Sequence, residues 1–178
     1  NWLAVWHELE ALGSLANFGY LYPQAVTADV SLASSVPFSA QQVGHPLIAE
    51  EDRVYNDFTI SELGDLVLIT GSNMAGKSTF LRTIGLNICL ALNGAPVLAR
   101  ELRTIPFRIF ASITVTDSVT DGFSFFYAEV RRLRALLDYL EEGQATPLFF
   151  LIDEIFRGTN NRERLIGSRS YVDELVGG

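Results

Sequence analysis

The feature that most constrains the fold is a glycine-rich segment between an apolar run and an apolar helical pattern. The run DLVLITG, which starts at Asp65, is unbroken and rich in leucine and β-branched residues, as in a buried strand. GSNMAGKS follows at Gly71–Ser78, and the apolar pattern of Ser78–Leu92 ends at Asn93-Gly94 and Pro96. The order of strand, glycine-rich loop and helix predicts an α/β fold.

The rest of the chain continues this alternation. RIFASITV, from Arg108, and PLFFLIDE, from Pro147, have the composition of buried strands, and the spacing predicts helices over Ser124–Glu142 and Arg162–Leu175. Trp2–Asn17 carries apolar residues at helical spacing and predicts a further, amphipathic helix. Helices that alternate with buried strands favour a largely parallel sheet flanked by helices.

The glycine-rich segment fits the pattern G-x-x-x-x-G-K-[ST] and has the flanking strand and helix that this pattern requires. In such a loop, backbone N–H groups and the helix dipole attract a phosphate. Lys77 is the only lysine in the chain, and its flexible ammonium group suits β- and γ-phosphates better than an arginine fork does. Ser78 is the expected Mg²⁺ ligand. The predicted nucleotide-binding residues are Gly71, Ser72, Asn73, Met74, Ala75, Gly76, Lys77, Ser78 and Thr79.

Two adjacent carboxylates, Asp153 and Glu154, end the second apolar strand. Burial of such charges is costly unless a cation lies beside them. We expect Asp153 to hold Mg²⁺ through water and Glu154 to act as the general base on the attacking water. Taken alone, the pair could also be solvated carboxylates at a strand end.

Ser124 precedes a predicted helix and has two readings. It is a natural N-cap, and a serine there can also meet the γ-phosphate of a nucleotide bound by a second copy of the domain. The spacing alone does not separate these roles.

The net charge of −8 belongs entirely to the first part of the chain. Residues 1–76 contain nine acidic residues and one basic residue, Arg53, and the remaining residues balance. Such a surface repels nucleic-acid phosphates, so if the full protein binds DNA, this segment is not its main DNA-binding surface. No signal peptide or membrane-length apolar run is present, and the single cysteine excludes a disulfide framework. These features favour a cytoplasmic setting.

Three segments together resemble the ATPase domain of the MutS DNA mismatch-repair proteins, which are relatives of the ABC ATPases. They are TGSNMAGKSTFLRTIG, DGFSFFYAEV and LIDEIFRGTN, and HPLI and Asn56-Asp57 also match. The resemblance covers residues 44–176. It implies a P-loop NTPase of ABC-ATPase type, with residues 44–178 as the ATPase domain and residues 1–43 as the end of a preceding helical core.

The resemblance also implies an activity and roles for individual residues. These are ATP hydrolysis with Mg²⁺, catalytic roles for Lys77, Glu154 and Ser124, and a homodimer of the full-length protein in which other domains bind DNA. The family's signature glutamate falls on Glu129. Its adenine platform falls near Arg53, so we expect Val54 and Tyr55 to contact the base. Tyr55 could equally be an aromatic residue of the core.

Departures from the family pattern indicate a divergent MutS-like member. This chain has Asp117-Ser118 where the family usually has an acidic pair. It has Ser124-Phe125-Phe126 where the family signature is usually Ser-Thr-Phe. The family's switch histidine and last strand are expected beyond Gly178, and turnover should need them. Two other functions stay open, namely another ABC-type ATPase of a chromosome-structure or transport system, and a non-catalytic nucleotide-binding module.

Overall fold

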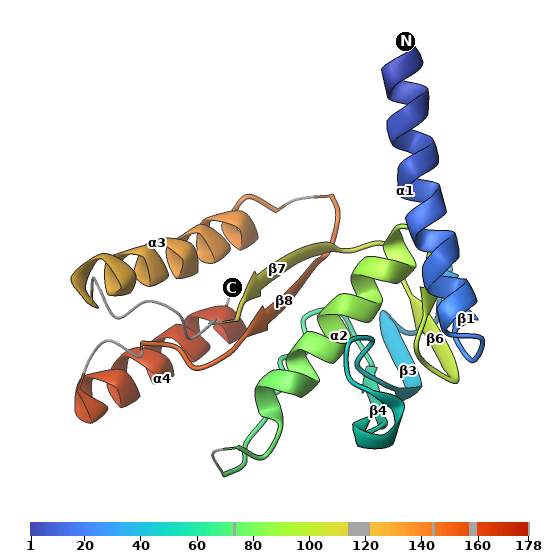
Figure 1. The fold of residues 1–178 in the computed structure, drawn as a ribbon. Coiled ribbons are helices and arrows are strands. Elements are labelled where there is room, and N and C mark those ends of the chain that lie inside the picture. Colours follow the sequence, from blue (N-terminus) through green and yellow to red (C-terminus); the bar gives the residue numbers. More distant parts are fainter. Residues whose placement is uncertain (73, 114–121, 144, 157–159, 178) are drawn as a thin grey trace. The chain divides into compact units, whose positions relative to one another are not determined.

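The computed structural model describes residues 1–178 except 73, 114–121, 144, 157–159 and 178 (Figure 1). The helices are α1 Trp2–Leu21, α2 Lys77–Leu92, α3 Gly122–Glu141 and α4 Asn161–Gly177, with a short 3-10 helix at Glu50–Asp52. The strands are β1 Val26–Thr27, β2 Asp29–Val30, β3 Phe38–Val43, β4 Asn56–Ile60, β5 Pro96–Val97, β6 Glu101–Thr104, β7 Arg108–Ser112 and β8 Leu148–Ile152. The chain divides into two compact units, of which the first comprises residues 1–65 and 82–106 and the second comprises residues 66–81 and 107–178.

The first unit is built on a four-stranded sheet in the order β2-β6-β3-β4. β2 runs parallel to β6, whereas β3 is antiparallel to both β6 and β4. β1 and β5 form a separate antiparallel pair. Apolar side chains from β3, β6 and residues 82–92 of α2 make the core, with these fully buried members: Phe38, Val43, Ile84, Ile88 and Leu102.

A buried amide fixes residues 82–92 of α2 within the first unit. The Asn87 side chain is fully buried, and its Nδ2 donates to the carbonyl oxygens of Gly44 at 3.0 Å and Thr83 at 2.8 Å. Its Oδ1 accepts the N–H of Leu98 at 2.8 Å. Because a buried amide is costly without partners, these bonds tie the helix to the loops after β3 and β5.

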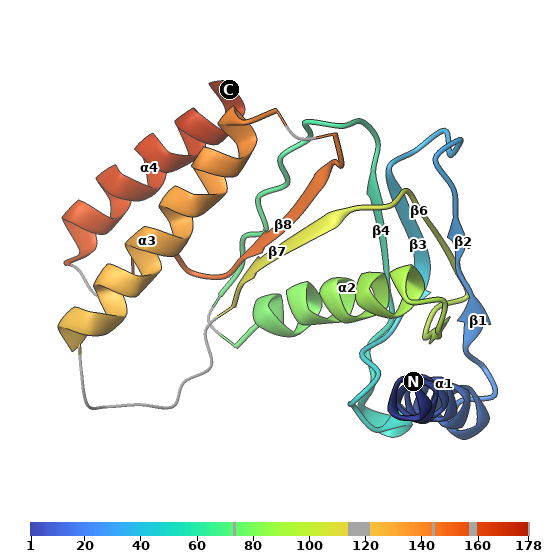
Figure 2. The same ribbon diagram turned by 90° about the horizontal axis from the view of Figure 1, so that it is seen from above.

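The second unit pairs β7 with β8 in parallel, from Arg108↔Leu148 to Ser112↔Ile152. Helices α3 and α4 lie beside each other next to these strands (Figure 2). Leu133 and Leu136 of α3 and Tyr171 of α4 are buried together, and partly buried side chains of both strands pack against them. The predicted strands at Arg108 and Pro147 and the two predicted helices that follow them are confirmed. These elements form because they bury their apolar side chains against one another.

The predicted fold class is wrong. The expected P-loop NTPase of ABC-ATPase type requires one mostly parallel sheet, but the described residues form a small α/β domain with mixed, antiparallel and two-stranded sheets. The main reason lies in residues 65–71, which were predicted to be a buried strand and pair with no strand among the described residues. Val67 and Leu68 are 48% and 67% exposed. Of the three predicted buried strands, only β7 and β8 therefore pair in parallel.

Two helices differ in detail from their predicted bounds. α1 continues to Leu21, four residues past the expected end, and the apolar stripe of Trp2, Trp6, Leu9 and Leu12 is exposed. α3 begins at Gly122, so Ser124 lies in its first turn and not at the cap position. Helix ends vary by one or two residues, and Ser124 still stands at the positive end of the helix dipole.

Candidate functional site

The glycine-rich loop turns sharply before α2 begins. Met74 and Gly76 both have positive φ, 66° and 87°, and the N–H of Ala75 donates to the Ser72 carbonyl at 3.3 Å. Glycine is the residue that adopts such a φ without steric strain, which accounts for Gly76. The N–H of Phe80 then donates to the Gly76 carbonyl at 2.8 Å and starts the helix. The N-terminus of α2, the positive end of the helix dipole, therefore lies directly after the loop; Asn73 lies outside the described residues.

The Lys77 side chain is hydrogen-bonded to the backbone of the loop that precedes it. Its Nζ donates to the carbonyl oxygens of Gly71 at 2.9 Å and Ser72 at 2.7 Å. The ammonium charge is thus held over the loop, where an incoming anion would meet it together with the helix N-terminus. Ser78, one residue further, lies half-buried in the first turn of the helix.

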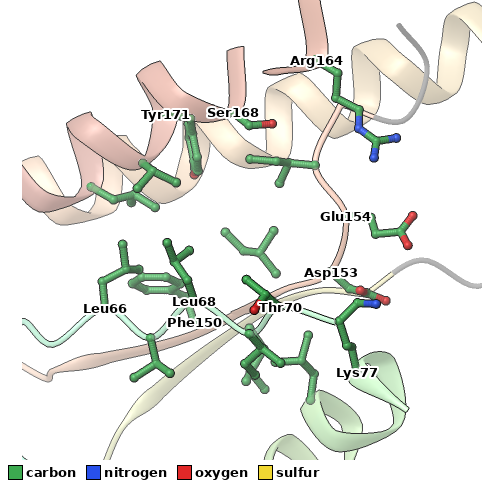
Figure 3. Close-up of a pocket in the computed structure, with 18 residues that line it drawn as sticks. Leu66, Leu68, Thr70, Lys77, Phe150, Asp153, Glu154, Arg164, Ser168 and Tyr171 are labelled. Atoms are coloured by element: carbon green, nitrogen blue, oxygen red, sulfur yellow. The ribbon is translucent and has the colours of Figure 1, made fainter. Parts of the chain in front are cut away.

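The two predicted carboxylates follow β8 directly. The N–H of Asp153 extends the ladder by donating to the Ser112 carbonyl at 2.9 Å, and the residue is only 7% exposed. Glu154 is exposed and has a φ of 47°. Figure 3 shows both carboxylates and the Lys77 ammonium group at the same end of a pocket. The structure therefore brings together the predicted cation and the predicted acidic pair.

This pocket, about 570 Å³ in volume, lies entirely within the second unit. Its walls are mostly apolar and come from residues 66–70, from β8 and from α4. At the polar end, Arg164 from the start of α4 accompanies Lys77, Asp153 and Glu154, with its side chain directed toward that end (Figure 3). Sequence reasoning missed Arg164, because an arginine on a helix with many charges carries no distinctive pattern.

The predicted base platform belongs to the first unit, so its relation to a nucleotide stays a prediction. Val54 is 72% exposed and Tyr55 is 42% exposed. The neighbouring Arg53 is buried, and its guanidinium group donates to the carbonyl oxygens of His45 and Ile48 and to the Tyr55 hydroxyl. Arg53 is thereby committed to holding this loop. Burial, and then the charges of Arg82 and Arg53, lower the pKa of His45.

The remaining predicted site residues are placed only in part. Thr79 lies in the first turn of α2, and the side chain of Ser124 lies outside the described part of the chain, as do Asp117-Ser118 and Arg157-Gly158-Thr159. Within the described part, no three His, Cys, Asp or Glu side chains gather as they would around a metal ion. Mg²⁺ at phosphate sites commonly takes only one or two protein ligands, and the buried Asp153 and the Ser78 hydroxyl fit that donor set.

This geometry defines a small α/β protein with a candidate anion and metal site between a glycine-rich loop and a strand end. The chain belongs to the MutS domain V family, whose pattern matches residues 67–177. It is 34% identical over 94% of its length to the endonuclease MutS2 of Thermus thermophilus. It is 32% and 31% identical, over 85% and 95% of its length, to the DNA mismatch repair proteins MutS of Rickettsia akari and Ehrlichia chaffeensis.

The chain spans about a fifth of the length of these relatives, 22%, 18% and 21% respectively. Family membership confirms the resemblance to MutS proteins that the three sequence segments predicted. The predicted boundary at residues 43 and 44 stays a prediction. Among the described residues, no helix combines the length and the apolar character needed to span a membrane.

Proposed function

We propose that this chain binds ATP with Mg²⁺ at the loop Gly71–Thr79 and hydrolyses it. The cycle would switch the conformation of a MutS-like protein that binds mismatched DNA or another DNA structure. The observation that carries the proposal is the meeting of Lys77 with Asp153 and Glu154 at one end of the pocket. A cation over a turned loop and two carboxylates opposite it are the groups that phosphoryl transfer to water requires.

Each of these residues has a separate role in the proposed reaction. The loop N–H groups and Lys77 bind the β- and γ-phosphates, and Lys77 exchanges its two carbonyl contacts for phosphate oxygens. Ser78 and Asp153 would hold Mg²⁺, which would neutralise phosphate charge. Glu154, exposed at the pocket end, orients the attacking water and accepts its proton.

The partners follow from family membership and charge. Relatives are named as DNA mismatch repair proteins, and residues 1–76 of this chain are strongly acidic. DNA would therefore contact parts of the full-length protein outside this chain. In a homodimer, Ser124, near the positive end of α3, would meet the γ-phosphate bound by the partner subunit.

The test is Glu154→Gln in the full-length protein. The glutamine keeps the size of the side chain but cannot accept a proton, so Mg²⁺-ATP should still bind while turnover falls by about 100-fold or more. Binding is measured by equilibrium titration and turnover by phosphate release. Glu174→Gln, an exposed change on α4, is the control and should leave both unchanged. Near-normal turnover in Glu154→Gln would move the base to another residue, and binding without turnover in the unsubstituted protein would indicate a non-catalytic module.

A further inference from the structure

The turn after β8 contains two non-glycine residues in the left-handed region. Glu154 has a φ of 47° and Phe156 has a φ of 59°. This region is sterically unfavourable for residues with a Cβ, and such a conformation persists only where surrounding contacts enforce it. The direction of the Glu154 carboxylate therefore depends on whatever holds this turn.

One of these contacts comes from α3. Oε1 of Glu129 accepts the backbone N–H of Phe156 at 2.8 Å, across 27 positions of sequence. Glu129 is half-buried, and its Oε1 is bonded to a main-chain group of the strained turn. A hydrogen bond to a carboxylate is stronger than one between neutral groups. Glu129 is thus suited to fix the backbone two residues after Glu154.

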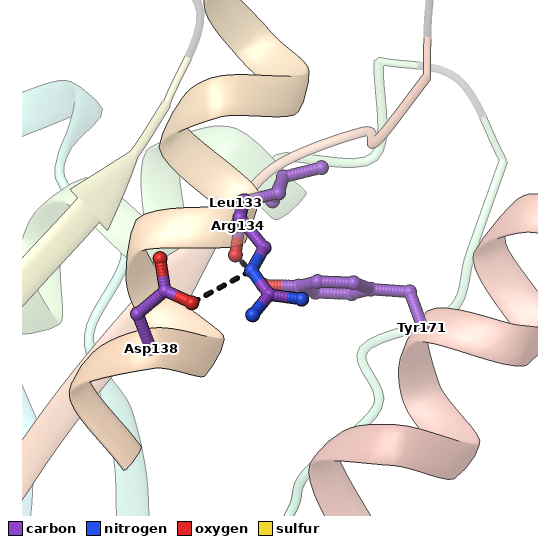
Figure 4. A network of polar contacts seen from close by, with 4 residues as sticks. All are labelled: Leu133, Arg134, Asp138 and Tyr171. Atoms are coloured by element: carbon purple, nitrogen blue, oxygen red, sulfur yellow. Dashed lines mark hydrogen bonds and ion pairs between the residues drawn. The ribbon is translucent and has the colours of Figure 1, made fainter. Parts of the chain in front are cut away.

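The other contacts come from α4 and leave the turn little freedom. A Cβ added to Gly167 would lie 3.2 Å from two atoms of the Phe156 ring, so the helix backbone and this ring are already close. The Phe156 and Tyr171 rings meet edge to face, with centroids 6.4 Å apart. The Tyr171 hydroxyl donates to the Leu133 carbonyl of α3 at 3.0 Å, one helical turn beyond Glu129 (Figure 4). Contacts from both α3 and α4 therefore hold the turn in this conformation.

We propose that Glu129 is a positioning residue for hydrolysis: its carboxylate holds the Phe156 N–H and so keeps Glu154 directed at the polar end of the pocket. This role rests on the proposed ATP hydrolysis. Because Glu129 and Ser124 lie on the same helix, a shift of α3 would also move the turn that carries Glu154. The activity of Glu154 is then linked to the position of α3.

Two conservative substitutions separate positioning from direct chemistry. Glu129→Gln keeps an oxygen acceptor at full reach without the charge, and Glu129→Asp keeps the charge on a side chain one methylene shorter. Positioning predicts that the glutamine variant retains most of its kcat, while the aspartate variant loses about 10- to 100-fold in kcat. KM and ATP affinity should change little in both, since Lys77 and the loop make the phosphate contacts.

The experiment uses the full-length protein, with Glu141→Gln on the exposed end of α3 as the control. Steady-state turnover, ATP titration and amide hydrogen exchange are measured for each variant. The Phe156 N–H should exchange faster in Glu129→Asp than in Glu129→Gln, a readout that does not require turnover. Unchanged exchange in Glu129→Asp, or a glutamine variant slower in turnover than the aspartate variant, would overturn the positioning role. If instead the proposed function is wrong, the unsubstituted protein will not bind ATP, and this result is distinct from either outcome above.

Discussion

At the scale of single residues, the loop that follows β3 is controlled by one buried arginine. The Arg53 guanidinium group donates to the carbonyl oxygens of His45 and Ile48, and it lies 5.6 Å and 6.0 Å from the ring centroids of Tyr22 and Tyr55. A buried arginine is tolerated because its donors are used and its charge faces aromatic rings. Its neighbours therefore have little room to move.

Gly44 shows how little room remains. A Cβ there would lie 2.6 Å from Arg53 Cδ and 2.8 Å from Tyr55 Cε1, so Gly44→Ala should destabilise the protein by about 1–3 kcal/mol. Gly13→Ala is the matched control, because Gly13 lies within α1 with nothing within 4 Å of an added Cβ. That change should stabilise by about 0.5–1 kcal/mol. Urea unfolding followed by circular dichroism measures both, and a neutral Gly44→Ala would contradict the packing described.

His45 should make stability depend on pH in a defined direction. Burial, then Arg82 and Arg53, lower its pKa in the folded protein below the ordinary value of 6.5. The unfolded chain then binds the proton more readily. The contribution of His45 to stability is fully present above about pH 6.5 and is lost as the pH falls toward the folded pKa. Nδ1 of His45 accepts the Leu47 N–H at 3.2 Å, as a neutral ring does.

The variant His45→Asn tests this effect. Asparagine keeps an oxygen acceptor near the Leu47 N–H but does not titrate. The fall in unfolding free energy between about pH 6.5 and pH 5 should therefore be shallower in the variant than in the original protein. Urea midpoints across that range supply the measurement, and identical slopes would show that His45 does not titrate differently in the folded state.

At the scale of elements, local sequence patterns predicted the secondary structure of most segments, but they did not predict every strand pairing. The helical spacing after Lys77 and the apolar run after Pro147 were sufficient for α2 and β8, since these elements bury their apolar faces. Residues 66–70 have the same composition as a buried strand, yet they line a pocket without pairing in the described residues. A strand also needs a partner for its backbone groups, and composition does not specify that partner.

The candidate site was predictable to a similar degree. The glycine-rich loop and the acidic strand end carry strong local patterns, and the structure brings Lys77, Asp153 and Glu154 to one end of a pocket. The contact between Glu129 and Phe156 joins residues 27 positions apart through a main-chain N–H. No side-chain pattern records such a bond, so only the three-dimensional arrangement reveals it.

At the scale of the whole molecule, the proposal requires two chains for turnover. Lys77 and the N-terminus of α2 would form the proposed phosphate site within one chain, while Ser124 stands in the first turn of a different helix. Mixing full-length Lys77→Ala with full-length Ser124→Ala should restore part of the ATPase activity, because each mixed dimer keeps one intact composite site. Phosphate release before and after mixing measures it. If mixed dimers form and stay inactive, Ser124 does not act on the nucleotide bound by the partner subunit.

The central claim, that the loop before α2 binds ATP through Lys77, is tested most directly by the affinity of full-length Lys77→Ala for Mg²⁺-ATP. Removal of the ammonium group deletes the charged contact to the phosphates, so affinity should fall by about 100-fold. Arg162→Ala, an exposed change at the start of α4, should bind as the original protein does. Circular dichroism should show the fold intact in both variants. An unchanged affinity in folded Lys77→Ala would contradict the account.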